Sequence, residues 1–251
     1  MLVGLAMESV GIGFALAFAL ISGDPFPSAA GAGWSLVAGI AGVIGLLAFY
    51  RGLATGSMSL VAPVAAVVGA GLPVIAGCIF GEQLAPGQVL GILAALGAVG
   101  LVSRPVEGDD GAARGGVWLA LFAGLGFAGY FVGMDRAIAA GAGTWWPLPL
   151  ARAGSIVVTG AGLVATGQAR GLRRVATPLI LVCGLGDTLG NLGFLAARSM
   201  GSLGPSAVVA SLYPAVTVVL AWLFLSERLS RQHLAGVALA FAGIVLIALP
   251  G

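Results

Sequence analysis

Residues 211–248 read SLYPAVTVVLAWLFLSERLSRQHLAGVALAFAGIVLIA. Two apolar runs lie on either side of a short polar turn that contains Glu227 and Arg228. An α-helix needs about 20 consecutive apolar residues to cross roughly 30 Å of hydrocarbon, and each run approaches that length. The stretch therefore predicts two consecutive membrane-spanning helices, over 203–225 and 231–249, with the bilayer as their solvent.

The composition of the whole chain agrees with a membrane environment. Hydrophobic residues fill 59% of the 251 positions and charged residues only 8%, whereas a soluble domain carries about 25% charge. The 43 glycines favour tight packing, because small residues let helices approach closely in lipid. The eleven basic residues are spread thinly over the loops, which argues against nucleic acid as a partner.

The remaining apolar runs predict further spanning helices. The first run lacks a basic residue and carries Glu8, so we expect it to be a spanning helix rather than a cleaved signal peptide. A polar linker at 104–114 separates four predicted helices from five. The nine predicted helices lie at 2–21, 34–54, 58–80, 86–103, 115–136, 145–167, 177–197, 203–225 and 231–249.

An internal repeat divides the chain into two related halves. A shift of 145 positions places Glu82 on Glu227 and the dipeptide 56–57 on the identical dipeptide 201–202. We therefore expect a first repeat over 1–103 and a second over 115–251. The two halves match without a gap across some sixty residues.

The repeat also predicts topology. Repeats with an odd number of helices insert into the membrane in opposite orientations, as in many secondary transporters. The second repeat has five predicted helices and the first has four, so we expect a plan of ten helices from which the first is missing. Either the chain starts at an internal methionine of its reading frame, or the protein functions with nine spans.

The quoted stretch resembles the carboxyl-terminal repeat of the EamA family, within the drug/metabolite transporter superfamily. The first half resembles the same unit, through FYRGLATG at 49–56 and GEQL at 81–84. The resemblance implies a ten-helix inverted repeat around a central cavity that carries metabolites such as amino acids. It also implies a multi-pass protein of the cell inner (plasma) membrane.

Three charged residues fall inside the predicted spans: Glu8, Arg152 and Asp187. A charge at the centre of a spanning helix costs about 2.5–3.5 kcal/mol on insertion scales, so each of them needs a partner or a function. We predict an ion pair between Arg152 and Asp187. Asp187 and Asn191, one turn later, are candidates for the polar floor of a substrate site, and the alternative is an ion pair that only locks two helices. Glu8 is a further candidate for the pathway, or else reaches the membrane interface.

Prolines interrupt two helices at equivalent places in the repeats. Pro63 lies in the helix at 58–80 and Pro214 in the helix at 203–225. Paired, proline-broken spans indicate a transporter binding site, because the freed backbone carbonyls need a cavity or a ligand. Tyr213 adds a hydroxyl that could bind substrate. The alternative is a pair of kinks that only shape packing.

Glu82 and Glu227 are not expected to act together. Opposite insertion of the repeats places the two carboxylates on opposite membrane faces, and each lies in a short turn. We therefore predict that both stabilise turns and helix ends.

These features favour a transporter that moves a small metabolite, amino-acid-like or another small organic solute, by alternating access. A proton is a candidate coupling ion at Asp187. One alternative is a structural or regulatory subunit that needs a partner, and a homo-oligomer is a candidate assembly. A lipid-modifying enzyme is disfavoured because no cluster of acids, histidines or activated nucleophiles occurs. Cys78 and Cys183 lack any metal-ligand spacing, so we expect neither a metal nor another cofactor.

Overall fold

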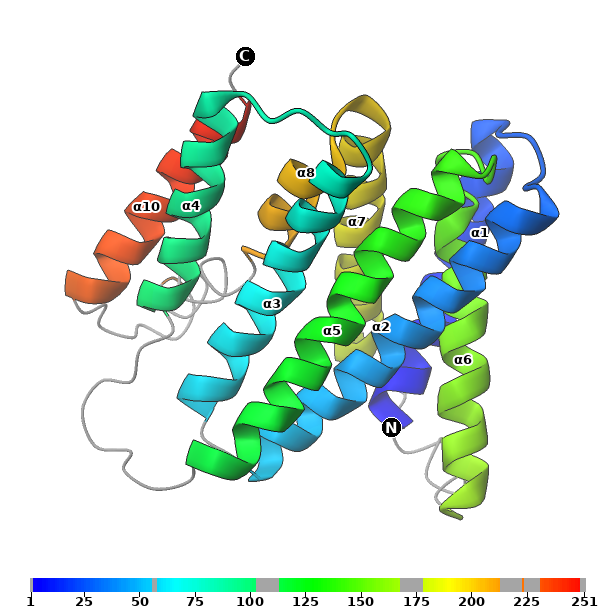
Figure 1. Ribbon diagram of the computed structural model, residues 1–251. Helices are drawn as coiled ribbons and strands as arrows, with labels where there is room; N and C mark the ends of the chain where they lie inside the picture. The colour runs from blue at the N-terminus through cyan, green and yellow to red at the C-terminus, as the bar shows by residue number, and fades with distance from the viewer. Residues whose placement is uncertain are drawn as a thin grey trace. The chain divides into compact units, whose positions relative to one another are not determined.

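A computed structural model describes residues 2–55, 58–102, 113–167, 178–212, 223 and 231–248. Within these ranges the chain forms only α-helices and their connections (Figure 1). The helices are α1 (Leu2–Ser22), α2 (Ala29–Thr55), α3 (Met58–Ile79), α4 (Pro86–Val102), α5 (Ala113–Ala139), α6 (Pro147–Ala165), α7 (Pro178–Met200), α8 (Leu203–Ala210) and α10 (Arg231–Ala248).

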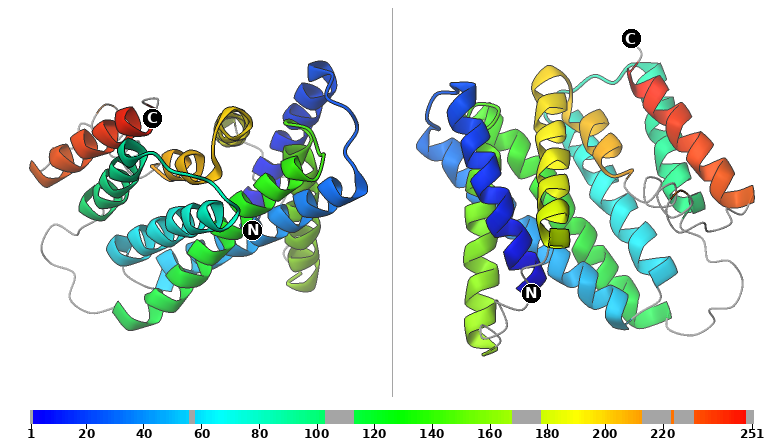
Figure 2. Two further views of the ribbon diagram at one scale, coloured as in Figure 1. Left: turned by 45° about the horizontal axis from the view of Figure 1, so that its top comes forward. Right: turned by 180° about the vertical axis from the view of Figure 1, so that it is seen from behind.

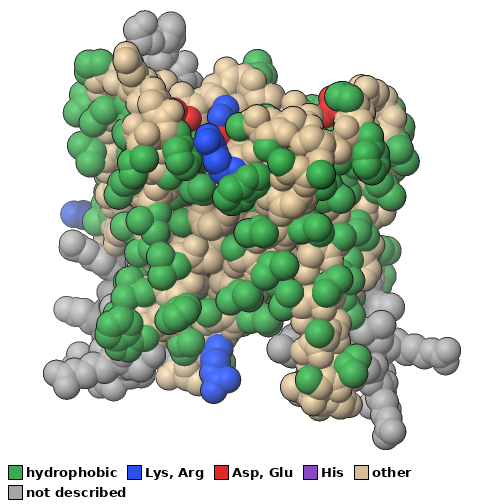
Figure 3. Space-filling view, turned by 45° about the vertical axis from the view of Figure 1, so that its right-hand side comes forward, with side chains coloured by type: hydrophobic (Ala, Val, Ile, Leu, Met, Phe, Trp, Pro, Cys, Tyr) green, Lys and Arg blue, Asp and Glu red, His purple; other side chains and the backbone are tan. Residues whose placement is uncertain are grey.

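The predicted all-α membrane fold is confirmed. In the described part of the chain, α1, α2, α5, α6 and α7 are long and apolar enough to cross a membrane, and α3, α4 and α10 contain shorter apolar segments. Hydrophobic side chains are spread over the face drawn in Figure 3, with few charged side chains among them. Such a surface suits contact with lipid tails.

The span predicted over 203–225 is not one unbroken helix, which agrees with the interruption predicted at Pro214. α8 ends at Ala210, and Ser211 and Leu212 form a turn. Pro214 supplies the reason, since it has no N–H for the carbonyl of Ala210 and its ring would clash with that carbonyl in a continued helix. The other predicted helices agree with the structure to within a few residues at most ends.

Helix boundaries follow the repeat closely. A shift of 145 positions carries the first residue of α1 onto that of α6, of α3 onto that of α8, and of α4 onto that of α10. The same shift carries the last residue of α2 onto that of α7. The two halves of the sequence therefore encode the same order of helices.

The compact units of the structure differ from the sequence repeats. One unit consists of residues 1–44 and 129–201, and the other of 45–128 and 202–251. Each unit contains equivalent helices from both repeats: α1 and α6 in the first, α3 with α8 and α4 with α10 in the second. The helices α2 and α5 contribute a part to each unit. Helices that are distant in sequence thus complete one another's packing.

In the first unit, α1 packs against α6 and α7, and lies between them in the right-hand view of Figure 2. Glycines permit these close approaches. A Cβ added at Gly184 of α7 would lie 3.0 Å from the carbonyl oxygen of Met7 in α1. A Cβ on Gly39 of α2 would come closer still, against the backbone carbonyl of Ala151 in α6, and Ser155 donates a hydrogen bond of 3.0 Å to the carbonyl of Gly39. Because Gly39 and Gly184 are equivalent under the repeat shift, both repeats place a glycine at a close contact between helices.

The connections of the first unit are fixed by polar contacts. Asp24, between α1 and α2, accepts hydrogen bonds from the backbone N–H groups of Thr144 (2.7 Å) and Trp145 (2.9 Å) before α6. Phe18 packs edge to face on Trp145, with ring centroids 4.8 Å apart. These contacts hold two connections at the same end of the unit.

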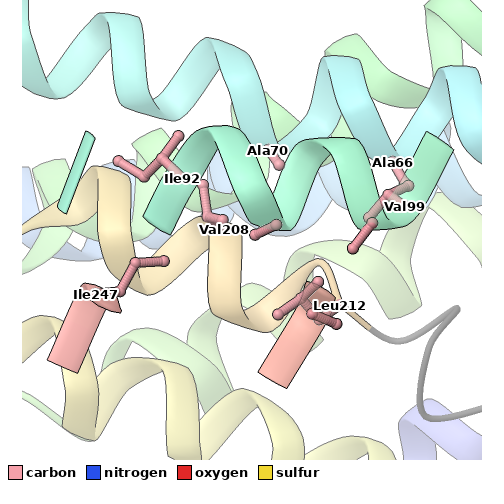
Figure 4. Close-up of a cluster of buried hydrophobic side chains, with 10 residues drawn as sticks. Ala66, Ala70, Ile92, Val99, Val208, Leu212 and Ile247 are labelled. Atoms are coloured by element: carbon pink, nitrogen blue, oxygen red, sulfur yellow. The ribbon is translucent and has the colours of Figure 1, made fainter. Parts of the chain in front are cut away.

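In the second unit, α4 packs along α10, and α3 packs against α8 (Figure 1). A Cβ on Gly91 would lie 2.8 Å from the carbonyl oxygen of Gly243, so this α4–α10 contact also depends on glycine. Buried side chains from α3, α4, α8 and α10 and the turn after α8 form one hydrophobic cluster, which Figure 4 draws with Ile92, Val99 and Val208 among its members. The cluster joins helices from both repeats.

Candidate functional site

The first compact unit brings together the three charged residues of the predicted spans. One terminal nitrogen of Arg152, Nη1, lies 2.8 Å from Oε2 of Glu8, and the other, Nη2, donates a hydrogen bond to Oδ2 of Asp187. The predicted pairing of Arg152 with Asp187 is confirmed. Glu8 is a second partner of the same guanidinium, which the sequence did not indicate.

Three helices position this charged cluster, which we define as Glu8, Arg152 and Asp187. Glu8 comes from α1, Arg152 from α6 and Asp187 from α7, and α1 packs against both other helices. Gly11, about one turn after Glu8, lets α1 approach α6 and α7 closely. A Cβ at that position would lie 2.6 Å from Oγ1 of Thr188 and 3.3 Å from Cζ of Arg152. Any side chain at Gly11 would therefore press on the cluster itself.

The members of the charged cluster differ in burial. The side chains of Arg152 and Glu8 are only 7% and 12% exposed, whereas that of Asp187 is 45% exposed. Nε of Arg152 is buried without a hydrogen-bond partner in the described part of the chain, and Oε2 of Glu8 is buried against Nη1 of the same arginine. Asp187 is thus the member that a solute can reach most directly.

A chain of hydrogen bonds extends the cluster to a tyrosine. Asn191 donates 2.8 Å to the backbone carbonyl of Asp187 and 3.4 Å to its Oδ1, and the hydroxyl of Tyr130 donates 2.6 Å to Oδ1 of Asn191. The predicted proximity of Asn191 to Asp187 is confirmed. Tyr130, on α5, was not predicted; its signal is a tyrosine inside an apolar span, where a hydroxyl needs a partner.

A second ionic group lies in the same unit, at the ends of α5 and α7. Asp135 is 1% exposed and accepts hydrogen bonds from both Arg136 (2.6 Å from Nη2) and Nε of Arg198. Arg198 also donates 2.8 Å to the carbonyl of Gly201, after α7. Sequence reasoning missed Asp135, although an aspartate next to an arginine near the end of a span is a signal for such a group. Its carboxylate is occupied by arginines, so it fits a structural role.

The remaining predicted site residues lie elsewhere. Pro63 is in α3, in the second compact unit. Tyr213 and Pro214 lie outside the described residues. The proline-based part of the predicted site therefore stays a prediction.

Glu82 has the role that the sequence predicts. Its carboxylate accepts hydrogen bonds from the backbone N–H of Leu203 and, at 3.2 Å, of Gly204, at the start of α8. A carboxylate at a helix N-terminus satisfies N–H groups that have no partner within the helix and interacts well with the helix dipole. Its repeat equivalent Glu227 lies outside the described residues.

Comparisons with known proteins agree with this architecture. A solved structure described only as "Crystal structure of protein" superposes with a TM-score of 0.72, at 18% sequence identity, over 98% of this chain and 86% of the other. That likeness concerns the fold. No curated protein matches the chain in sequence. The model of the EamA-like transporter family matches residues 114–249, which is more than half of the sequence. The chain belongs to the EamA-like transporter family.

Proposed function

We propose that this chain, which its family and its apolar helices make a multi-pass membrane transporter of small solutes, carries an amino-acid-like or another small organic solute. The solute binds at Asp187, Asn191 and Tyr130 beside Arg152. The protein moves it by alternating access, exposing this site first to one side of the membrane and then to the other.

One observation carries the proposal: a half-exposed carboxylate lies on a spanning helix, at the edge of an otherwise buried charged cluster. Ionisable residues within spanning helices are costly and usually mark a substrate or ion pathway. The neighbouring Asn191 amide and Tyr130 hydroxyl supply donors and acceptors for a polar solute. The combination suits recognition better than a lock between helices, which would be fully buried.

Proton coupling belongs to the same proposal. A carboxylate that exchanges its partner during transport can take up a proton from one side and release it to the other. Solute uptake into proteoliposomes, measured with and without an imposed pH gradient, tests this part. Uptake that does not respond to the gradient would exclude a proton as the coupling ion.

The site is tested by thermal stabilisation of the purified protein with amino acids, nucleosides, organic cations and sugars. A solute that binds only the folded state raises its stability. We expect one chemical class to raise the thermal midpoint of the wild type and to lose at least tenfold in apparent affinity in Asp187→Asn.

Ser199→Ala is the matched control. Ser199 is exposed on the same helix, and among the described residues its hydroxyl bonds only to the carbonyl of Ala196 in its own helix. The control should keep the full response. A response that survives Asp187→Asn would remove Asp187 from the binding site. Stabilisation by no solute at all would favour a subunit that functions only with a partner.

A further inference from the structure

The charged cluster is unbalanced. Glu8 and Asp187 each contribute one negative charge when ionised, and Arg152 contributes one positive charge. The polar side chains of Tyr130, Thr188 and Asn191 beside them are neutral, and in the described part of the chain the ion pairs join no further charged residue to the cluster. The fully ionised cluster therefore has one surplus negative charge.

A surplus charge inside spanning helices requires compensation. Burial removes the water that would stabilise the Glu8 carboxylate, and a buried ionic group is tolerated only when its charge is matched. Arg152 is shared between Glu8 and the more exposed Asp187, so an additional cation is needed at Glu8, and the smallest available cation is a proton.

Burial and hydrogen bonding assign different roles to the two carboxylates. Glu8 is almost buried, and the interaction that the structure gives its carboxylate is the ion pair of Oε2 with Nη1 of Arg152, at 2.8 Å. Asp187 is 45% exposed and has the Asn191 amide beside its Oδ1. Glu8 is thus the better place for a proton, and Asp187 is the better place for a group that arrives from outside.

We propose that the cluster exchanges one cation: Glu8 holds a proton when the site is empty, and a solute with a protonated amine displaces that proton as it binds Asp187. In the bound state Arg152 pairs with Glu8 and the ammonium group pairs with Asp187, so the charges balance. One ammonium enters and one proton leaves. This inference rests on the proposed function, because it names the solute class of the same site.

The charge count also excludes other solutes from the exchange. An amino acid at neutral pH carries a carboxylate that cancels its ammonium, so its binding leaves the surplus charge in place and the proton on Glu8. Sugars and nucleosides likewise bring no cation. Only a solute with a net positive charge, such as a primary amine without an acid group, releases the proton.

The test uses the full chain, purified in a weakly buffered detergent solution. Butylamine, benzylamine and phenethylamine are added, each beside the alcohol of the same carbon skeleton, while thermal midpoint and released protons are recorded. We expect stabilisation by amines and not by alcohols, with about one proton released per amine bound. Because the amine displaces a proton, its apparent affinity should also fall about tenfold for each unit by which the pH is lowered, over the pH range in which Glu8 is protonated.

Three variants distinguish an effect of the net charge of the cluster on amine binding from a general loss of stability. Glu8→Gln should release no proton, and its amine affinity should not depend on pH and should be at least tenfold weaker than that of the wild type where Glu8 exchanges its proton, because the surplus charge is gone. The double variant Glu8→Gln with Arg152→Gln leaves Asp187 as the only charge, so amine binding should return. Glu82→Gln removes a carboxylate from the second unit and should keep both amine binding and proton release.

Several results would overturn the inference. Amine binding without proton release, or amine binding unchanged in Glu8→Gln, would show that Glu8 exchanges no proton. If only amino acids, sugars or nucleosides stabilise the wild type, and Asp187→Asn removes that effect, the inference fails and the proposed function stands. If no solute of any class binds or is transported, both fail. Should Glu8→Gln not fold, the return of amine binding in the double variant still decides the charge count.

Discussion

Arg152 joins two helices to its own through the two branches of one guanidinium group. Nη1 faces Glu8 on α1 and Nη2 faces Asp187 on α7, and the side chain is 7% exposed. A lysine offers one ammonium and no planar fork, so it could not reproduce this arrangement. Arg152 is therefore the residue on which the packing of α1, α6 and α7 depends most.

Replacing Arg152 by glutamine should destabilise the protein strongly. The change leaves the charge of Asp187 without its cation, and removing one partner of a buried ionic group costs about 3–5 kcal/mol. Thermal unfolding in detergent measures the loss. Adding Asp187→Asn should recover part of it, since the stranded charge is removed. A single variant as stable as the wild type would show that the cluster adds nothing to folding.

Gly11 offers a second test at the scale of one residue. Gly11→Ala would place a Cβ 2.6 Å from Oγ1 of Thr188, and such overpacking costs about 1–3 kcal/mol. Gly13 lies two residues later on the same helix, and a Cβ there would have no atom within 4 Å. Gly13→Ala is thus a matched control that should leave the thermal midpoint unchanged or slightly raised. Equal effects of the two changes would mean that helix propensity, not contact with α7, decides the outcome.

At the scale of elements, the start of α8 depends on a carboxylate from a distant turn. Glu82, after α3, accepts hydrogen bonds from the N–H groups of Leu203 and Gly204. The helix spans only eight residues, Leu203–Ala210, and so short a helix is not stable without such contacts. Glu82 therefore joins elements of the two repeats inside the second unit.

Glu82→Ala should destabilise the protein by about 0.5–2 kcal/mol, as the loss of a helix cap does in other proteins. Hydrogen exchange of the amides of Leu203 and Gly204 should also become faster, because they lose their acceptor. Gln83→Ala, at the exposed neighbouring position, is the control and should change neither. Unaltered exchange in Glu82→Ala would remove the capping role.

At the scale of the whole molecule, the positions of the connections indicate how the helices cross the membrane. The segment between α1 and α2 lies against the start of α6, through Asp24 with Thr144 and through Phe26 with Trp146, whose ring centroids are 5.2 Å apart. Thr166 lies at the other end of α6. A helix of 19 residues spans roughly 28 Å at 1.5 Å per residue. Phe26 and Thr166 should therefore lie on opposite sides of the membrane.

Single cysteines test this arrangement, after Cys78 and Cys183 have been changed to alanine. In right-side-out vesicles, a membrane-impermeant maleimide should label only one of Phe26→Cys and Thr166→Cys, and in inverted vesicles only the other. Labelling of both from the same side would contradict the membrane path proposed for α6. Labelling with a permeant maleimide serves as the control for reactivity.

The sequence by itself determined the solvent, the secondary structure and the repeat. Apolar runs of spanning length leave the backbone no stable arrangement in lipid other than helices, so their positions could be predicted to within a few residues. Matching turns such as those at Glu82 and Glu227 identified the repeat without any coordinates. The span over 203–225 was predicted to be interrupted at Pro214, and α8 ends at Ala210, the residue whose carbonyl would need the N–H that this proline lacks.

The tertiary structure decided which helices complete the charged cluster and which residues form a compact unit. The pairing of Arg152 with Asp187 could be predicted, because few partners exist for a charge within the spans. The roles of Glu8 and Tyr130 depend on α1 and α5 packing beside helices more than a hundred and about sixty residues away. In lipid the hydrophobic effect does not choose between helix neighbours, so small residues such as Gly11, Gly39 and Gly184 decide which faces meet. That choice depends on three-dimensional fit, which no linear pattern of apolar residues records.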